Sequence, residues 1–194
     1  MERLDELETY IRDYWEELIQ RKKIGIQKQE PQLTDELCKK LNVLIEQQLL
    51  KQAEDQERKI QYLFLCQMKS SYYTGSYEVM LGLCNTMIFL DEDKSYAYWY
   101  PKPIFETIEV DMATVTNQLR KKFIRLEHYE LFYLKQQLLQ DYWEILNQTY
   151  IKMGDRIDEI IVKSSLVLND SFFMLSGNYM DMLKIVRREN NIWA

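Results

Sequence analysis

The sequence predicts an all-α fold, an antiparallel bundle of about six helices, two of them unusually long. The chain of 194 residues holds only five glycines and three prolines, too few for the turns of many short strands. Apolar residues recur at three- and four-residue spacing along most of the chain, which is the period of a helix with one buried face. The length favours a single helical domain, 1–194. An N-terminal half, 1–100, and a C-terminal half, 104–194, that share one core are the alternative.

Two helices joined by a polar linker are expected in the N-terminal third. An apolar stripe of leucines and isoleucines predicts the first helix, and Gly25 marks its end. Thr34 is suited to cap the second helix. This second helix is expected to continue through the polar stretch 51–59, because that stretch contains no glycine or proline. The two expected helices cover residues 2–23 and 34–68, with Pro31 in the linker.

Four more helices are expected around one irregular segment. The aromatic and proline-rich segment 96–103 forbids a regular helix at its end. Residues 87–100 fit either a short helix or a β-hairpin, and the sequence leaves both open. The expected helices cover residues 76–88, 111–153, 154–168 and 178–188, and the second of these is about 60 Å long at 1.5 Å per residue.

Charge and hydropathy argue against two classes of partner. The net charge of -6 and the pI near 5.0 repel polyphosphate, which argues against nucleic acid. No apolar run approaches the roughly 20 residues of a membrane-spanning helix, and the acidic start of the chain is unlike a signal peptide. We therefore expect a cytoplasmic protein that does not enter a membrane. Three short basic clusters, 21–23, 120–125 and 187–188, are interpreted as solvated helix faces.

The motifs of common enzyme classes are missing from the sequence. There is no Walker-type phosphate loop, no G-x-G-x-x-G and no G-x-S-x-G. A single histidine rules out the paired Glu-x-x-His motifs of di-metal helical bundles. Cys38, Cys66 and Cys84 lack metal-binding spacing and are expected to be small buried apolar residues. The sequence therefore predicts no catalytic residue, no metal and no cofactor.

One polar trio keeps an enzymatic alternative open. His128 is flanked by Glu127 and Glu130, an arrangement in which a carboxylate can orient a general base. The competing interpretation is that His128 is a hydrogen-bonded packing residue, because it follows Ile124 by four residues and precedes Leu131 by three.

Aromatic residues form the richest local feature. Tyrosine and tryptophan supply a large contact area and a polar tip, so they build partner-binding surfaces, ligand pockets and packed junctions between helices. All three interpretations remain open for this group. Its members are Tyr72, Tyr73, Tyr77, Tyr96, Tyr98, Trp99 and Tyr100.

A further pattern, within residues 62–99, consists of Phe64, Gly75–Glu78, Leu90–Asp93, Tyr98 and Trp99. This pattern resembles one unit of the tetratricopeptide repeat, a helical hairpin family that binds proteins and peptides. The chain departs from the family at the small residues, which are Met68, Met80 and Met87 here, and at the usual proline, which is Glu92. The resemblance implies a helical hairpin and a protein or peptide partner.

A tetrapeptide, Asp-Tyr-Trp-Glu, occurs at residues 13–16 and again at 141–144. The repetition indicates either a relic of duplication or two helices that use the same packing device. Duplication predicts similar surroundings for the two tryptophans.

These observations favour a non-enzymatic protein-interaction or regulatory module that contacts another protein or peptide through its aromatic segment. A small-molecule-binding protein or an enzyme with an aromatic pocket between helices is the alternative. Long helices with apolar stripes also allow a homo-oligomer.

Overall fold

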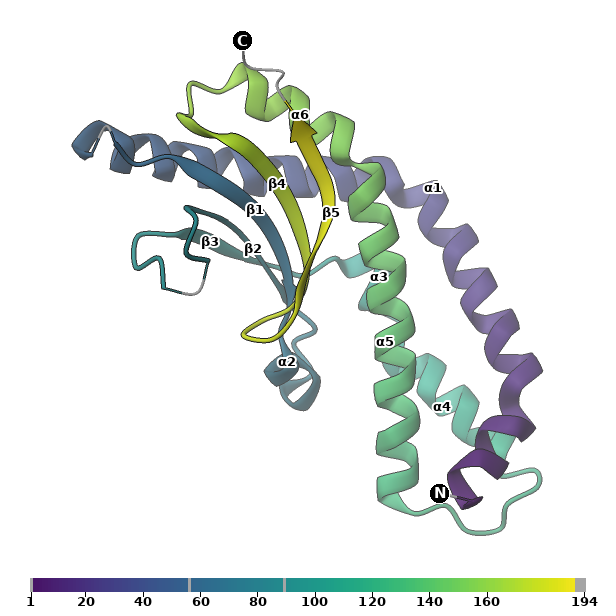
Figure 1. Cartoon of the computed structure of the whole chain (residues 1–194). Helices are drawn as coiled ribbons and strands as arrows, with labels where there is room; N and C mark the ends of the chain where they lie inside the picture. The colour runs from purple at the N-terminus through teal and green to yellow at the C-terminus, as the bar shows by residue number, and fades with distance from the viewer. Residues whose placement is uncertain (1, 56, 89, 191–194) are drawn as a thin grey trace. The chain divides into compact units, whose positions relative to one another are not determined.

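Six helices and a five-stranded mixed sheet make up the described part of the chain, so the expected all-α bundle is wrong (Figure 1). The computed structural model describes residues 2–55, 57–88 and 90–190. The helices are α1 (Glu2–Glu54), α2 (Lys69–Thr74), α3 (Lys102–Phe105), α4 (Ile108–Leu119), α5 (His128–Lys152) and α6 (Gly154–Lys163). The strands are β1 (Ile60–Gln67), β2 (Val79–Cys84), β3 (Ser95–Trp99), β4 (Leu168–Asn178) and β5 (Leu183–Asn190).

The chain forms two compact units, each made of two separate stretches of sequence. The described residues of 1–30 and 102–146 form one, here called the helical unit. The described residues of 31–101 and 147–194 form the other, the sheet unit, which holds all five strands.

In the helical unit, the first part of α1 runs parallel to the first part of α5. Both helices can be followed upward from the end that holds the N-terminus (Figure 1). Three pairs of hydrogen-bonded side chains join them, and the residue numbers of both partners rise together along the helices. The pairs are Arg3 with Glu130, Glu8 with Tyr133, and Trp15 with Asp141. The fully buried side chains of the unit include Leu7, Val115, Leu119, Leu138 and Tyr142.

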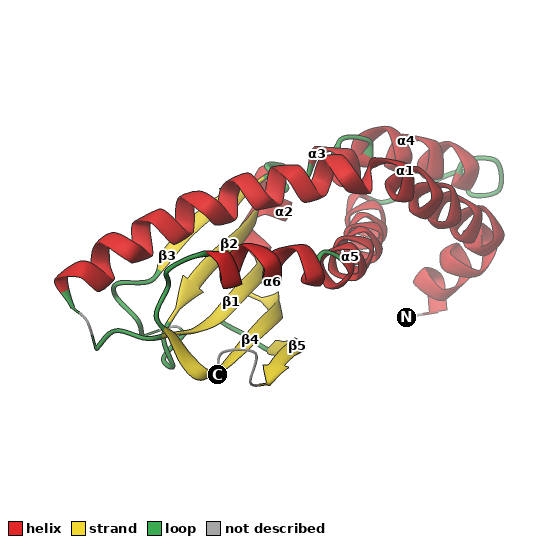
Figure 2. Ribbon diagram, turned by 90° about the horizontal axis from the view of Figure 1, so that it is seen from above, coloured by secondary structure: helices red, strands yellow, loops and turns green. Residues whose placement is uncertain are grey.

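In the sheet unit, the strand order is β3-β2-β1-β4-β5. The central strand β1 pairs antiparallel with β2, where Leu63 lies opposite Leu83, and parallel with β4, where Leu63 lies beside Met174. The second part of α1 and α6 lie on the same side of the sheet (Figure 2). Buried side chains on this side include Leu37, Leu41 and Leu44 of α1, Ile157 and Ile161 of α6, and Leu63 and Leu65 of β1.

The opposite sheet face carries a second, smaller apolar cluster. Its buried members are Phe64, Cys66, Met80, Cys84 and Leu175. Gly82 makes room for this cluster, because a Cβ at residue 82 would lie 2.2 Å from Cζ of the Phe64 ring. The cluster shows that both faces of β1 are buried.

The expected helices fail where the chain forms central strands. Every residue of β2 and most residues of β1 are buried, so these strands read as continuous apolar runs without alternation. Such runs match helical spacing as readily as strand spacing. The end of the helix expected over 34–68 and the helix expected over 76–88 are therefore wrong, and so is the hairpin of helices implied by the tetratricopeptide resemblance over 62–99. The helix expected over 178–188 is wrong as well, because these residues lead into the edge strand β5, whose described side chains at 183–187 are half-buried or exposed.

The helical half of the prediction needs smaller corrections. The expected linker around Gly25 and Pro31 is helical, since α1 continues through both residues to Glu54. Proline has no backbone N–H, so one carbonyl of the preceding helical turn lacks its usual donor. Because Pro31 is exposed, water can donate a hydrogen bond to that carbonyl instead. The helix expected over 111–153 is two helices, because α4 ends at Leu119 and α5 begins at His128.

Within the described residues, no helix has both the length and the apolar character that crossing a bilayer requires.

Candidate functional site

The seven aromatic residues predicted as a binding group all lie in the sheet unit, and the strand β3 divides them by face. Tyr96 and Tyr98 are 48% and 46% exposed, and their rings meet edge to face with centroids 5.8 Å apart. Trp99 points to the other face and is buried, where its Nε1 donates a hydrogen bond to Glu36 Oε2 of α1 at 3.3 Å. Trp99 therefore packs the interior, and Tyr96 and Tyr98 face solvent.

The other four aromatic residues surround one end of β2 and β3. Tyr72 and Tyr73 belong to α2, Tyr77 precedes β2, and Tyr100 follows β3. Tyr77 is buried and has a positive φ of 50°, which marks it as a residue of the turn into β2. Burial raises the pKa of the Tyr72 phenol well above its ordinary value. The burial of Tyr77 and Trp99 favours the packing interpretation for these two residues.

The two edges of the sheet differ in how they are protected. Natural proteins protect an edge strand from pairing with another chain by charged side chains, proline or a bulge. The edge strand β5 carries the exposed Lys184 and a register shift between Met174 and Leu175 of its neighbour. The edge strand β3, Ser95–Trp99, contains no charged residue and no proline, and it pairs with β2 in regular register. In the described part of the chain, no strand pairs with the outer edge of β3.

The polar trio at the start of α5 serves as a helix cap. Glu130 is 2% exposed in its side chain and accepts hydrogen bonds from the backbone N–H of Glu127 at 2.7 Å and from Arg3 Nε at 3.1 Å. The bond to Glu127 is half of a capping box. His128 is exposed, so it is not a residue of the apolar face, and no described hydrogen bond joins it to either glutamate. Glu130 is engaged with Arg3 and with the Glu127 backbone, so the described contacts give no support to its orienting His128.

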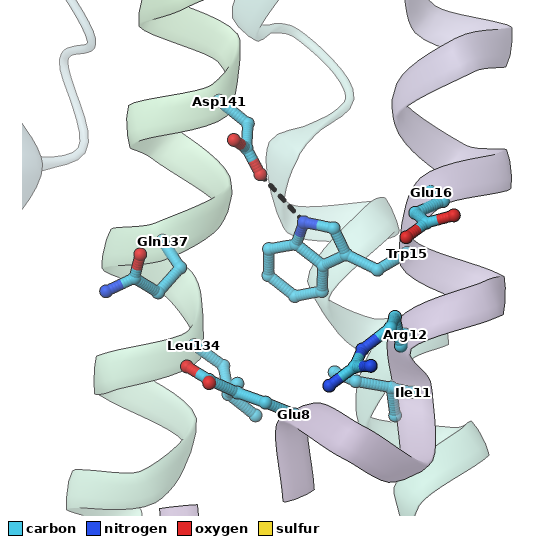
Figure 3. A pocket seen from close by; sticks show the side chains of 8 residues that line it. All are labelled: Glu8, Ile11, Arg12, Trp15, Glu16, Leu134, Gln137 and Asp141. Atoms are coloured by element: carbon cyan, nitrogen blue, oxygen red, sulfur yellow. Dashed lines mark hydrogen bonds between the residues drawn. The ribbon is translucent and has the colours of Figure 1, made fainter. Parts of the chain in front are cut away.

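A pocket of about 280 Å³ opens elsewhere, between α1 and α5 of the helical unit (Figure 3). The side chain of Trp15 reaches from α1 toward α5, where its Nε1 donates a hydrogen bond of 2.7 Å to Asp141 Oδ2. Ile11 and Leu134 are buried and supply apolar wall. The remaining lining residues are Glu8, Arg12, Glu16 and Gln137.

Two of the carboxylates of this pocket are held by aromatic donors. Asp141 accepts from Trp15, and Glu8 accepts from the Tyr133 hydroxyl through its Oε1 at 2.8 Å. The hydrogen bond to Glu8 raises the pKa of the Tyr133 phenol, and desolvation adds to the shift. In both pairs the described bond uses one carboxylate oxygen, so the second oxygen can accept from a ligand.

A separate polar network ties α1, α4 and α5 together. Asp111 Oδ2 accepts hydrogen bonds from the Thr107 hydroxyl and the Tyr142 hydroxyl, each at 2.5 Å, and Lys22 Nζ donates to Thr107 Oγ1 at 2.9 Å. Lys22 Nζ also lies 4.9 Å from the centroid of the Tyr142 ring. Burial lowers the pKa of Lys22, although Asp111 and Glu106 oppose the shift, and burial raises the pKa of Tyr142 above its ordinary value. These groups satisfy one another, so we interpret the network as a structural tie.

Residues of the other two basic clusters also contact aromatic rings and carboxylates within their own unit. Lys122 Nζ lies over the rings of Tyr10 and Phe123, at 5.0 Å and 5.4 Å from their centroids. Arg187 of β5 forms ion pairs with Asp155 at 2.7 Å and with Asp158 at 2.6 Å. These contacts favour packing and pairing roles over a phosphate-binding surface.

The sequence missed the pocket residues, although the repeated tetrapeptide contained a signal. Trp15 comes from the first copy and Asp141 from the second, so the two copies contact each other. Their surroundings differ, since Trp15 is half-buried at the pocket and Trp143 is 5% exposed in the core. This difference contradicts duplication and favours two uses of one packing device.

Comparison with known proteins finds no match among protein families, curated proteins or solved structures. Within the described residues, no three histidine, cysteine, aspartate or glutamate side chains gather closely enough to hold a metal ion. The functional interpretation of the candidate sites therefore rests on their geometry alone.

Proposed function

We propose that the protein is an interaction module that binds an extended segment of another protein along the outer edge of β3. The observation that carries this proposal is the unprotected edge of β3 beside the exposed rings of Tyr96 and Tyr98. In strand addition, backbone hydrogen bonds supply affinity and alternate side chains supply specificity.

The composition of β3 indicates the kind of segment that fits. The strand offers about 17 Å of edge over its five residues, at roughly 3.4 Å per residue. Tyr96 and Tyr98 lie opposite Gly82 and Met80 in the sheet, on the face that carries the apolar cluster. A partner strand would place every second side chain beside these tyrosines. The segment that suits this edge is therefore short, extended and apolar at alternate positions.

Peptides selected from a displayed random library on the purified protein provide the test. The dissociation constant of a selected peptide is measured with the wild type and with Tyr96→Thr and Tyr98→Thr, which keep a good strand former at each position. We expect at least tenfold weaker binding in both variants, because buried tyrosines carry much of the energy of such interfaces. Tyr129→Thr is the matched control, since Tyr129 is 61% exposed on α5 in the helical unit.

Hydrogen exchange supplies the second readout. Strand addition slows the exchange of amides within residues 95–99 when the peptide binds. Equal binding by all variants, or protection of other segments alone, would contradict the proposal. A mass that doubles with concentration and returns to the monomer value in the β3 variants would mean that the edge pairs with a second copy of this chain instead.

A further inference from the structure

We propose that the pocket between α1 and α5 of the helical unit binds a small organic cation, an alkylammonium or guanidinium group with an apolar stem. This site lies in the helical unit and is independent of the interaction proposed for β3. Its ligand is either a free amine or the lysine or arginine side chain of a partner protein, because both present the same chemistry.

The charge of the lining favours a cation. Glu8, Glu16 and Asp141 bring three carboxylates to the pocket, and Arg12 brings one guanidinium. The indole N–H of Trp15 is already engaged by Asp141, so it is not free to bind an anion. The oxygens of Glu8 and Asp141 that their aromatic donors do not use are therefore the main polar groups offered to a ligand.

The walls fit the stem and the head group of such a cation. Ile11 and Leu134 provide buried apolar surface for methylene groups. The Trp15 indole supplies the aromatic surface that attracts ammonium and guanidinium groups. The volume of about 280 Å³ is equivalent to roughly nine water molecules, which suits a ligand of a few heavy atoms.

The spacing of the carboxylates argues for an organic cation over a metal ion. Glu8 and Trp15, the partner of Asp141, are seven residues apart on α1, a rise of about 10 Å. A metal ion needs its oxygen ligands within about 2–2.6 Å. An elongated cation can approach one carboxylate with its charged head and fill the space toward the other with its stem.

Both carboxylates are prepared for binding before a ligand arrives. Each is held at one oxygen by an aromatic donor, so little side-chain freedom is lost when the other oxygen accepts from a ligand. The donor to Asp141 is the neutral indole of Trp15, which leaves the negative charge of the carboxylate available to a cation, whereas an arginine in its place would neutralise that charge.

The test follows the indole N–H resonance of Trp15 by nuclear magnetic resonance, identified by its loss in Trp15→Phe. The protein is titrated with n-butylammonium chloride, with n-butanol as the uncharged control and sodium chloride as the ionic-strength control. We expect a saturable shift with the ammonium salt alone. A parallel titration with a short lysine-containing peptide distinguishes the sources, since a response to the peptide alone assigns the site to a partner side chain.

Three variants decide whether the pocket is responsible. Asp141→Asn keeps an acceptor for Trp15 but removes the charge, and we expect at least tenfold weaker binding. Asp13→Asn is the matched control, because Asp13 begins the other copy of the tetrapeptide and is exposed outside the pocket lining. Arg12→Gln removes the competing positive charge, so it should tighten binding a few-fold.

The absence of a saturable shift with both probes overturns the proposal. So does equal loss in Asp141→Asn and Asp13→Asn, or weaker binding in Arg12→Gln, which would show that the charge of Arg12 does not compete with the cation. None of these outcomes depends on β3, so the proposed function and this inference can fail separately.

Discussion

Gly82 shows how one missing side chain shapes the second apolar cluster of the sheet. Phe64 of β1 and Gly82 of β2 lie opposite each other in the antiparallel pair, and the ring of Phe64 covers the glycine. Any side chain at residue 82 would meet this ring, which is 1% exposed and has little space to move.

Replacing Gly82 by alanine is expected to destabilise the protein by about 1–3 kcal/mol, the usual cost of overpacking a core. The free energy of unfolding in urea measures this change. Gly25→Ala is the control, because a Cβ at Gly25 meets nothing within 4 Å and the residue lies inside α1. The control should stabilise the protein by about 0.5–1 kcal/mol. A neutral Gly82→Ala variant would show that the Phe64 ring can relax.

At the scale of residues, the sequence indicated an aromatic group that contains the exposed Tyr96 and Tyr98. It did not show which members of that group are exposed and which are buried. Alternate residues of a strand point to opposite faces, so Tyr98 is exposed and Trp99 is buried. That division follows only once β3 is recognised as a strand. The repeated tetrapeptide contains Trp15 and Asp141, but their contact at the pocket could not be predicted, since they are 126 residues apart and meet only through tertiary packing.

At the scale of elements, the three cysteines report on different parts of the fold. Cys66 of β1 and Cys84 of β2 are 0% exposed, whereas Cys38 of α1 is half-buried. Burial raises the pKa of Cys66 and of Cys84 to about 12 in each case. Desolvation also raises the pKa of Cys38, opposed by Arg156. The strands should therefore protect their thiols more completely than the helix does.

Labelling with a thiol-reactive disulfide at pH 8 is expected to modify Cys38 in the native protein and the other two cysteines only after unfolding. The thiolate is the reacting species, and burial suppresses both its formation and its access. Cys38→Ser should abolish the fast reaction. Fast modification of two or more thiols in the native protein would show that β1 and β2 open readily.

The same two thiols predict a loss of stability at high pH. Their folded pKa values near 12 exceed the ordinary value of 9.0, so the folded state keeps protons that the unfolded state releases. Their contribution is complete below about pH 9 and is lost as the pH rises toward 12. The fall in unfolding free energy between pH 8 and pH 10.5 should be smaller in a Cys66→Ala and Cys84→Ala double variant than in the wild type. An equal fall in both proteins contradicts this assignment.

The elements that the sequence predicted best are amphipathic helices. The apolar stripes of 2–23 and of the region after Thr34 lie in α1, and Gly154 begins α6 as expected. Central strands were missed because burial on both faces removes the alternation by which a strand is recognised. Gly25 and Pro31 were wrongly predicted to lie outside a helix for another reason, since a half-buried glycine and an exposed proline weaken a long helix without ending it.

At the scale of the whole molecule, each unit draws on both halves of the chain. The sheet needs β4 and β5 beside β1, and these strands follow the helices of the other unit in sequence. The N-terminal half therefore contains three strands of a five-stranded sheet, with the second edge of β1 unpaired.

A fragment of residues 1–101 is expected not to fold alone, although it contains α1 and the β1–β3 strands. Removal of β4 exposes the backbone and the apolar side chains of β1, which favours aggregation. Co-expression with residues 102–194 should restore a soluble complex with the circular dichroism spectrum of the intact chain. A soluble, cooperatively unfolding 1–101 fragment would contradict this dependence on β4.

The parallel pairing of β1 with β4 also has a consequence during synthesis on the ribosome. About 100 residues separate the end of β1 from the start of β4, so β1 waits roughly 5–20 s for its partner at ordinary elongation rates. For that interval an apolar strand with one open edge is exposed on the nascent chain. The protein is thus expected to depend on chaperones that shield emerging strands, and slower growth at low temperature should favour its soluble yield.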